Sequence, residues 1–135
     1  MKILGLDVGT KTIGLAIGLS ERKITQPLQT LARKSVRKDT DALVVICKER
    51  DITKLVVGLP LELSGKEGRS ARLARQIGDS LAEKTGLPLV YHDERFSTVE
   101  AEERLLAVGK NAKQRKKIID QVAAMVIIED WWRGV

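Results

Sequence analysis

The chain has 135 residues, of which 43% are hydrophobic and 31% charged, and its formal net charge is +6 at pH 7. A chain of this length buries one sizeable core, so we expect a single domain over residues 1–135. No segment approaches the roughly 18 uninterrupted apolar residues of a membrane-spanning helix, and the N-terminus begins with a strand-like run instead of a cleavable signal. We therefore expect a cytoplasmic protein with no membrane contact.

The first half of the chain reads as three strands and a helix. Apolar runs predict strands over residues 2–8, 13–18 and 24–31, with a tight turn at residues 9–12 that makes the first two strands a hairpin. Pro27 places the third strand at an edge or at a strand start, because proline cannot donate a hydrogen bond to the ladder. A helix follows over residues 39–50, with Leu43, Ile46 and Cys47 on one face.

The second half alternates between the two kinds of element. We expect strands over residues 54–58 and 87–92, and helices over 69–85, 97–106 and 114–132. Gly86 and Pro88 end the first of these helices, and Ser97 with Glu100 forms a capping box that opens the second. This order predicts an α/β fold. A three-strand antiparallel meander runs into βαβ units to form a mixed five-stranded sheet with helices on both faces and the first strand near its centre.

Three carboxylates lie in or beside apolar segments, where an ionised group is costly. Asp7 ends the first strand, Glu94 follows the fifth, and Asp120 interrupts the apolar stretch of the last helix. Burying such a group requires a cation, a hydrogen-bond network or a metal ion. Each one taken singly is typical of a helix cap or a salt-bridged strand end, whereas all three together favour one divalent metal centre.

The acidic pair at the end of the fifth strand requires a choice. Neighbours on a strand point to opposite faces, so only one of Asp93 and Glu94 readily faces Asp7, and we choose Glu94. Asp93 remains an auxiliary candidate, together with Lys11 in the turn after Asp7. Arg95 is a candidate phosphate clamp, with a surface ion pair as the equally plain alternative.

Oxygen ligands select a hard cation, so we expect Mg²⁺ or Mn²⁺ held by Asp7, Glu94 and Asp120. Basic residues cluster at 33–38 and again just before the last helix. The second cluster is the candidate contact for a nucleic-acid backbone, and consists of Lys110, Lys113, Arg115, Lys116 and Lys117. For the first cluster, a solvated surface loop is an equal alternative. Carboxylates, metal and basic clusters together predict metal-assisted phosphodiester hydrolysis.

At these residues the chain resembles the YqgF family, also called RuvX, of Holliday junction resolvases with a ribonuclease H-like fold. The resemblance runs over essentially the whole chain and rests on four motifs in order. They are Leu6-Asp7-Val8-Gly9-Thr10-Lys11, Val57-Gly58-Leu59-Pro60, Asp93-Glu94-Arg95-Phe96-Ser97-Thr98 and Asp120-Gln121-Val122-Ala123-Ala124. It implies an acidic active site at Asp7, Glu94 and Asp120. It also implies an endonuclease that acts on branched DNA or on the precursor of small-subunit ribosomal RNA, which is a step in ribosome biogenesis.

Other readings remain open at this point. One is a nucleic-acid-binding module that kept the fold and lost turnover, and another is a single phosphate-binding lobe related to the actin and sugar-kinase ATPases. Within the nuclease reading, the choice between RNA and DNA, the number of metal ions and the cleavage preference stay undetermined. We expect a monomer or a weak homodimer, since no clear dimer face is evident.

Overall fold

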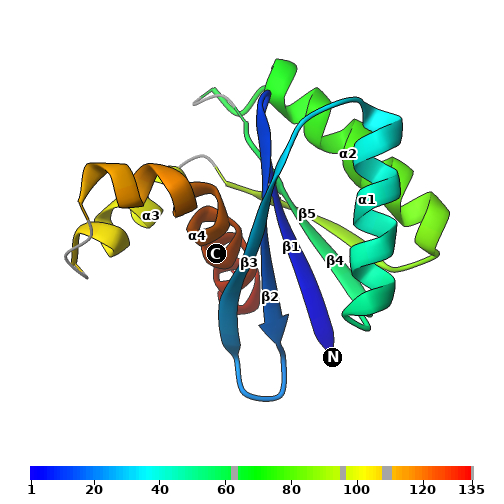
Figure 1. Cartoon of the computed structure of the whole chain (residues 1–135), viewed down its shortest axis with the longest axis horizontal. Helices are drawn as coiled ribbons and strands as arrows, with labels where there is room; N and C mark the ends of the chain where they lie inside the picture. The colour runs from blue at the N-terminus through cyan, green and yellow to red at the C-terminus, as the bar shows by residue number, and fades with distance from the viewer. Residues whose placement is uncertain (62–63, 95–96, 108–110, 135) are drawn as a thin grey trace.

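The computed structural model describes residues 1–61, 64–94, 97–107 and 111–134, with the backbone alone for residues 97–100, 102 and 112–117. Figure 1 shows the chain as one sheet with helices on two sides. The strands are β1 (Lys2–Val8), β2 (Thr12–Leu19), β3 (Ile24–Ala32), β4 (Lys54–Leu59) and β5 (Leu89–Asp93). The helices are α1 (Val36–Glu49), α2 (Arg69–Thr85), α3 (Ser97–Ala107) and α4 (Ala112–Arg133). The predicted order of elements is confirmed.

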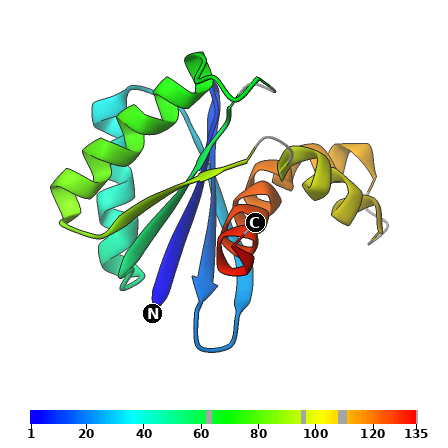
Figure 2. The ribbon, with the colours of Figure 1, turned by 180° about the vertical axis from the view of Figure 1, so that it is seen from behind.

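The five strands form one mixed sheet in the order β3-β2-β1-β4-β5. β1, β2 and β3 pair antiparallel as the predicted meander, while β4 lies parallel to β1, and β5 parallel to β4. β1 is therefore central, as predicted, and Figure 2 shows the same sheet from behind. β3 is an edge strand, and its register shifts beside Pro27, where a ladder donor is missing.

The helices are divided between the two faces of the sheet. α1 and α2 cover one face and enclose the larger apolar cluster, which includes Leu4, Leu6, Leu15, Leu43 and Ile77. α4 covers the other face, where Ala124, Ile127 and Ile128 pack on Ile3 and Val56. α3 packs on α4 through a third cluster and lies to the side of the sheet (Figure 1). The predicted arrangement of helices on both faces is confirmed.

The first basic cluster is part loop and part helix, with residues 33–35 in the connection after β3 and residues 36–38 in the first turn of α1. α1 begins at Val36, three residues earlier than expected, because the Ser35 side chain accepts a hydrogen bond from the Lys38 backbone N–H and caps the helix. Residues 33–38 therefore span the corner between β3 and α1, which places their side chains beside the end of the sheet.

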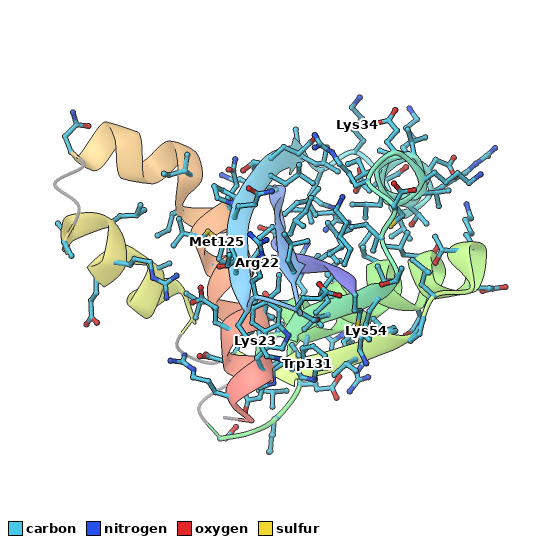
Figure 3. The ribbon with its side chains drawn as sticks, turned by 90° about the horizontal axis from the view of Figure 1, so that it is seen from below. Arg22, Lys23, Lys34, Lys54, Met125 and Trp131 are labelled. Carbon is cyan, nitrogen blue, oxygen red and sulfur yellow. The ribbon has the colours of Figure 1, made fainter. Side chains whose placement is uncertain are left out.

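The two tryptophans near the C-terminus pack on the apolar cluster between α4 and the sheet. Trp131 and Trp132 extend the α4 cluster, and lysine ammonium groups cover both rings. Lys54 lies 4.8 Å from the Trp131 ring centroid and Lys23 lies 5.0 Å from that of Trp132. Figure 3 shows Trp131 close to Lys54 in this region.

No helix in the described ranges has the length and apolar character needed to cross a bilayer.

Candidate acidic active site

Asp7 lies near the end of the central strand with a glycine on each side of it. In the antiparallel ladder it pairs with Gly14, and the parallel pair Leu6–Val57 places Gly58 beside it on the other side. The three residues thus form a row across β2, β1 and β4. Since neither glycine carries a side chain, the layer of side chains on the sheet face that α4 covers has a gap on each side of Asp7. We call this gap the hollow, and neighbouring segments fill it.

Asp120 enters this hollow from α4, against Gly14. A Cβ atom added at Gly14 would lie 2.1 Å from the Asp120 carbonyl oxygen and 2.6 Å from its Cβ. No other residue than glycine therefore permits α4 to approach β2 so closely at this point. The Asp120 carboxylate is held by the Thr12 hydroxyl, which donates a hydrogen bond of 2.6 Å to Oδ2.

Glu94 enters the hollow from the other side, over Gly58. A Cβ atom at Gly58 would lie 2.6 Å from Glu94 Cδ and 2.5 Å from Ile127 Cδ1. The Glu94 side chain is buried, with 8% of its surface exposed, and its backbone N–H donates to the Leu59 carbonyl across 3.2 Å. The end of β5 is thus tied to the end of β4, which brings this carboxyl group next to Asp7.

Asp7 interacts electrostatically with both of the other acids. Burial and the negative charge of Asp120 raise the pKa of Asp7 to about 7, and a hydrogen bond with Glu94 partly offsets that rise. Burial is the larger of the two causes, because a carboxylate removed from water is costly, and the nearby Asp120 charge adds to it. Perturbed carboxyl groups of this kind are concentrated at functional sites.

The donor set suits a hard divalent cation. All three side chains offer oxygen, and the pKa of Asp7 is raised by burial and by the Asp120 charge, both of which a bound cation would offset. Among the described residues, no three side chains of metal-binding type gather closely enough to hold an ion as they stand. The three carboxylates, as they lie, therefore do not form a preformed metal cage.

A network that the sequence did not reveal supports the turn after Asp7. The Gly9 N–H donates to the Thr12 carbonyl across 2.8 Å, and Arg33 Nη1 donates to the Gly9 carbonyl across 2.9 Å. Arg33 Nε is in turn paired with Asp39 at 2.7 Å, and both side chains are largely buried, with 11% and 3% exposed. Arg33 was grouped with the surface cations, whereas the structure gives it a buried partner.

The auxiliary candidates do not gather at the same point. Asp93 is exposed and follows His92 on β5. His92 pairs with Gly58, which lies beside Asp7, so His92 is on the same face of the sheet as Asp7. Because neighbours on a strand point to opposite faces, Asp93 lies on the other face. Lys11 is exposed in the turn, and its carbonyl accepts a hydrogen bond from the Arg33 backbone N–H at 2.8 Å. Arg95 lies outside the described residues.

The proposed nucleic-acid contacts before the last helix cannot be placed. Lys110 lies outside the described residues, as do the side chains of Lys113, Arg115, Lys116 and Lys117. Their backbone, apart from that of Lys110, belongs to the first turns of α4. These five residues remain predictions from the sequence.

Comparison with known proteins gives concordant results. The family model described as "RuvX: Holliday junction resolvase" matches residues 1–133. A protein of Myxococcus xanthus named "Putative pre-16S rRNA nuclease" is 40% identical over 131 residues, covering 97% of this chain and 87% of its own. A protein of Lactococcus lactis with the same name is 41% identical over 132 residues, covering 96% of this chain and 92% of its own.

Solved structures agree on the fold. RuvC of T. thermophilus, in complex with a Holliday junction substrate, superposes with a TM-score of 0.66 at 16% identity, over 99% of this chain and 96% of its own. The resolvase of Fowlpox virus, with its substrate Holliday junction DNA, superposes with a TM-score of 0.60 at 9% identity, over 99% of this chain and 97% of its own. The predicted ribonuclease H-like architecture is confirmed.

Proposed function

Because this chain belongs to the RuvX family, we propose that it is an endonuclease that hydrolyses phosphodiester bonds in structured nucleic acid with the help of Mg²⁺ or Mn²⁺. The observation that carries this proposal is the meeting of Asp7, Glu94 and Asp120 in the hollow between Gly14 and Gly58. Relatives named for pre-16S rRNA favour the precursor of small-subunit ribosomal RNA as the substrate.

The three proposed catalytic carboxylates are placed in different ways. Asp7 lies on the central strand, Asp120 is oriented by Thr12, and Glu94 is the most buried of the three. These three side chains would hold the cation. A bound divalent ion supplies an activated water and neutralises charge on the departing oxygen. The protein positions the scissile phosphate and excludes competing solvent from the Gly58 side of the site.

The first experiment measures cleavage of a labelled ribosomal RNA precursor and of a labelled four-way DNA junction. Each is incubated with Mg²⁺, with Mn²⁺ and with a chelator, using wild type and Asp7→Asn. We expect metal-dependent cleavage that the variant loses while it keeps binding. Asp51→Asn is the matched control, because Asp51 is exposed beyond the opposite end of β1 and its φ of 55° is one that asparagine tolerates.

Three results would change the proposal. Binding without cleavage of either substrate would support the non-catalytic module. ATP binding in place of nucleic-acid binding would support the phosphate-binding lobe. Cleavage that persists in Asp7→Asn would remove Asp7 from the active site.

A second substrate, branched DNA, is favoured by the description of the family model as a Holliday junction resolvase. Symmetric cleavage of a four-way junction calls for a two-fold dimer, whereas trimming of RNA at one site does not. Sedimentation at low protein concentration separates the two. A stable dimer that cuts the junction in preference to the RNA would make the DNA substrate the proposal.

A further inference from the structure

The corner between β3 and α1 carries two lysines at the same end of the sheet as the acidic site. In the sheet register Thr12 pairs with Ala32, and Thr12 is the residue that holds Asp120. Lys34 follows two residues later. Adjacent strands lie about 4.8 Å apart and a strand rises about 3.3 Å per residue, so the backbone of Lys34 lies on the order of 10 Å from that of Thr12.

The same corner is fastened to the turn that follows Asp7. The Arg33 backbone N–H and side chain donate to the carbonyls of Lys11 and Gly9, across 2.8 and 2.9 Å. Arg33 is largely buried, so this connection is shielded from water. The backbone of Lys34, the next residue along the chain, is therefore anchored to the turn beside the acidic site.

The acidic groups at this corner are already neutralised. Asp39 is paired with Arg33 and also accepts the Lys34 backbone N–H across 3.0 Å, and Asp41 is paired with Lys84 across 2.9 Å. The ammonium groups of Lys34 and Lys38 form no ion pair with the described part of the chain. Their positive charge therefore remains available to an outside anion.

The two lysines border a hollow of about 430 Å³ between the end of β3 and the first turns of α1, with Thr30 and Ala32 along its floor. Both side chains are exposed, and Figure 3 shows Lys34 at the periphery of the molecule, beside α1. This hollow is open to solvent, and its two acidic lining residues, Asp39 and Asp41, are the ones already paired with Arg33 and Lys84. The unpaired charges along it are therefore positive, which suits a phosphate backbone.

We propose that Lys34 and Lys38 bind backbone phosphates of the nucleic acid next to the cleavage site, so that one flank of the substrate runs from the acidic site across the β3–α1 corner. This inference rests on the proposed function for its ligand class. It predicts that contacts at this corner are insensitive to base sequence, since contacts to backbone phosphates carry no direct sequence information.

The test measures how binding depends on salt. The affinity of the labelled RNA precursor and of the labelled four-way junction is titrated in chelator, so that no cleavage occurs, for wild type and Lys34→Gln/Lys38→Gln. The slope of log affinity against log salt falls by about 0.7 to 0.9 for each phosphate that the protein no longer neutralises, so we expect a decrease of about 1.4 to 1.8 in the double variant.

The matched control is Lys48→Gln/Arg50→Gln, which removes the same charge at the opposite end of α1, where both residues are exposed. We expect its slope to equal that of wild type. Thermal melting of all three proteins verifies that they fold. Shortening the substrate on one flank alone should abolish the difference between Lys34→Gln/Lys38→Gln and wild type, because the contact lies on one side of the cut.

The outcomes separate this inference from the proposed function. If wild type cleaves but the two double variants share one slope, the corner is not a phosphate contact and the nuclease proposal stands. If wild type cleaves neither substrate and the lower slope is found, the nuclease proposal fails and the corner remains a binding surface. Absence of binding by wild type to both substrates would overturn the inference.

Discussion

Thr12 donates a hydrogen bond to Oδ2 of Asp120 across 2.6 Å, joining two residues that are 108 positions apart in the chain. Thr12 opens β2, directly after the turn that follows Asp7, and Asp120 lies on α4. The hydroxyl therefore fixes the orientation of one proposed catalytic carboxylate relative to the strand that carries another.

The first prediction follows from that contact. Thr12→Val keeps the shape of the side chain and removes the donor, so Asp120 loses its orientation. A hydrogen bond to a charged group contributes about 1.5 to 3 kcal/mol, and we expect kcat to fall roughly 10- to 100-fold with KM little changed. Thr12→Ser, which keeps the hydroxyl, should retain most of the activity. Equal kcat for Thr12→Val and wild type would show that the contact does not assist catalysis.

The second prediction concerns the hollow beside Asp7. In Gly58→Ala the added methyl group would overlap Glu94 and Ile127, at 2.6 and 2.5 Å in the present positions. We expect a loss of about 1 to 3 kcal/mol in unfolding free energy from overpacking, measured in urea. We also expect cleavage to fall further than the folded fraction does, because Glu94 is displaced.

Gly18→Ala is the control for that variant. Its methyl group would press on Ile128 and Trp132, at 2.9 and 3.1 Å, on the same sheet face but away from the carboxylates. We expect comparable destabilisation with cleavage retained by the folded protein. If both variants lose cleavage in proportion to stability alone, the space at Gly58 serves packing and not the site.

Much of this architecture was predictable from the sequence, because its causes are local. Apolar runs and helical periodicity define the elements, and Gly86 ends α2 with a φ of 71°, as a C-terminal glycine does. Asp7 and Asp120 stood out because each interrupts an apolar segment. Strand alternation then separated Glu94 from Asp93, and the structure places Glu94 beside Asp7.

The remaining features depend on contacts between distant segments. Gly14 and Gly58 lie inside predicted strands, but nothing local tells which groups approach them until α4 and the end of β5 are placed against them. Arg33 stands in a run of cations, which is typical of a solvated surface, and its burial follows only from the corner between β3 and α1. A basic run therefore does not tell which of its members is structural.

The third prediction concerns pH. The pKa of Asp7 rises to about 7 in the folded protein, whereas its ordinary value is 3.8. Between about pH 4 and 7 the folded protein therefore keeps a proton that the unfolded chain has released. The contribution of Asp7 to stability is greatest below about pH 4, declines as the pH rises to about 7, and is constant at higher pH.

Asp7→Asn removes this titration, so in chelator it should be more stable than wild type at pH 8, by on the order of 2 to 4 kcal/mol. Near pH 4 the two proteins should have similar unfolding free energies. Urea unfolding at several pH values measures the difference, and Asp51→Asn should follow wild type throughout. If Asp7→Asn were less stable than wild type at pH 8, the negative charge of Asp7 would be compensated by other groups in the folded state.

The last prediction concerns the buried pair of Arg33 and Asp39. Removing one member leaves the other charge buried, so Arg33→Met and Asp39→Leu should each cost about 3 to 5 kcal/mol in unfolding free energy. The variant Arg33→Met/Asp39→Leu leaves neither charge exposed to that penalty. We expect its loss of unfolding free energy to be clearly smaller than the sum of the losses in the two single variants. A double-mutant cycle in urea measures this difference.

Cleavage by the same variants separates stability from positioning. Arg33 also holds the Gly9 carbonyl across 2.9 Å, in the turn that links Asp7 to Thr12. Arg33→Met/Asp39→Leu regains stability without restoring that hydrogen bond, so its kcat should stay low at temperatures where it is fully folded. Asp39→Leu keeps Arg33 and should cleave better than the double variant under those conditions. If the double variant instead recovered wild-type kcat together with its stability, Arg33 would serve folding alone, and the turn after Asp7 would need no support from β3.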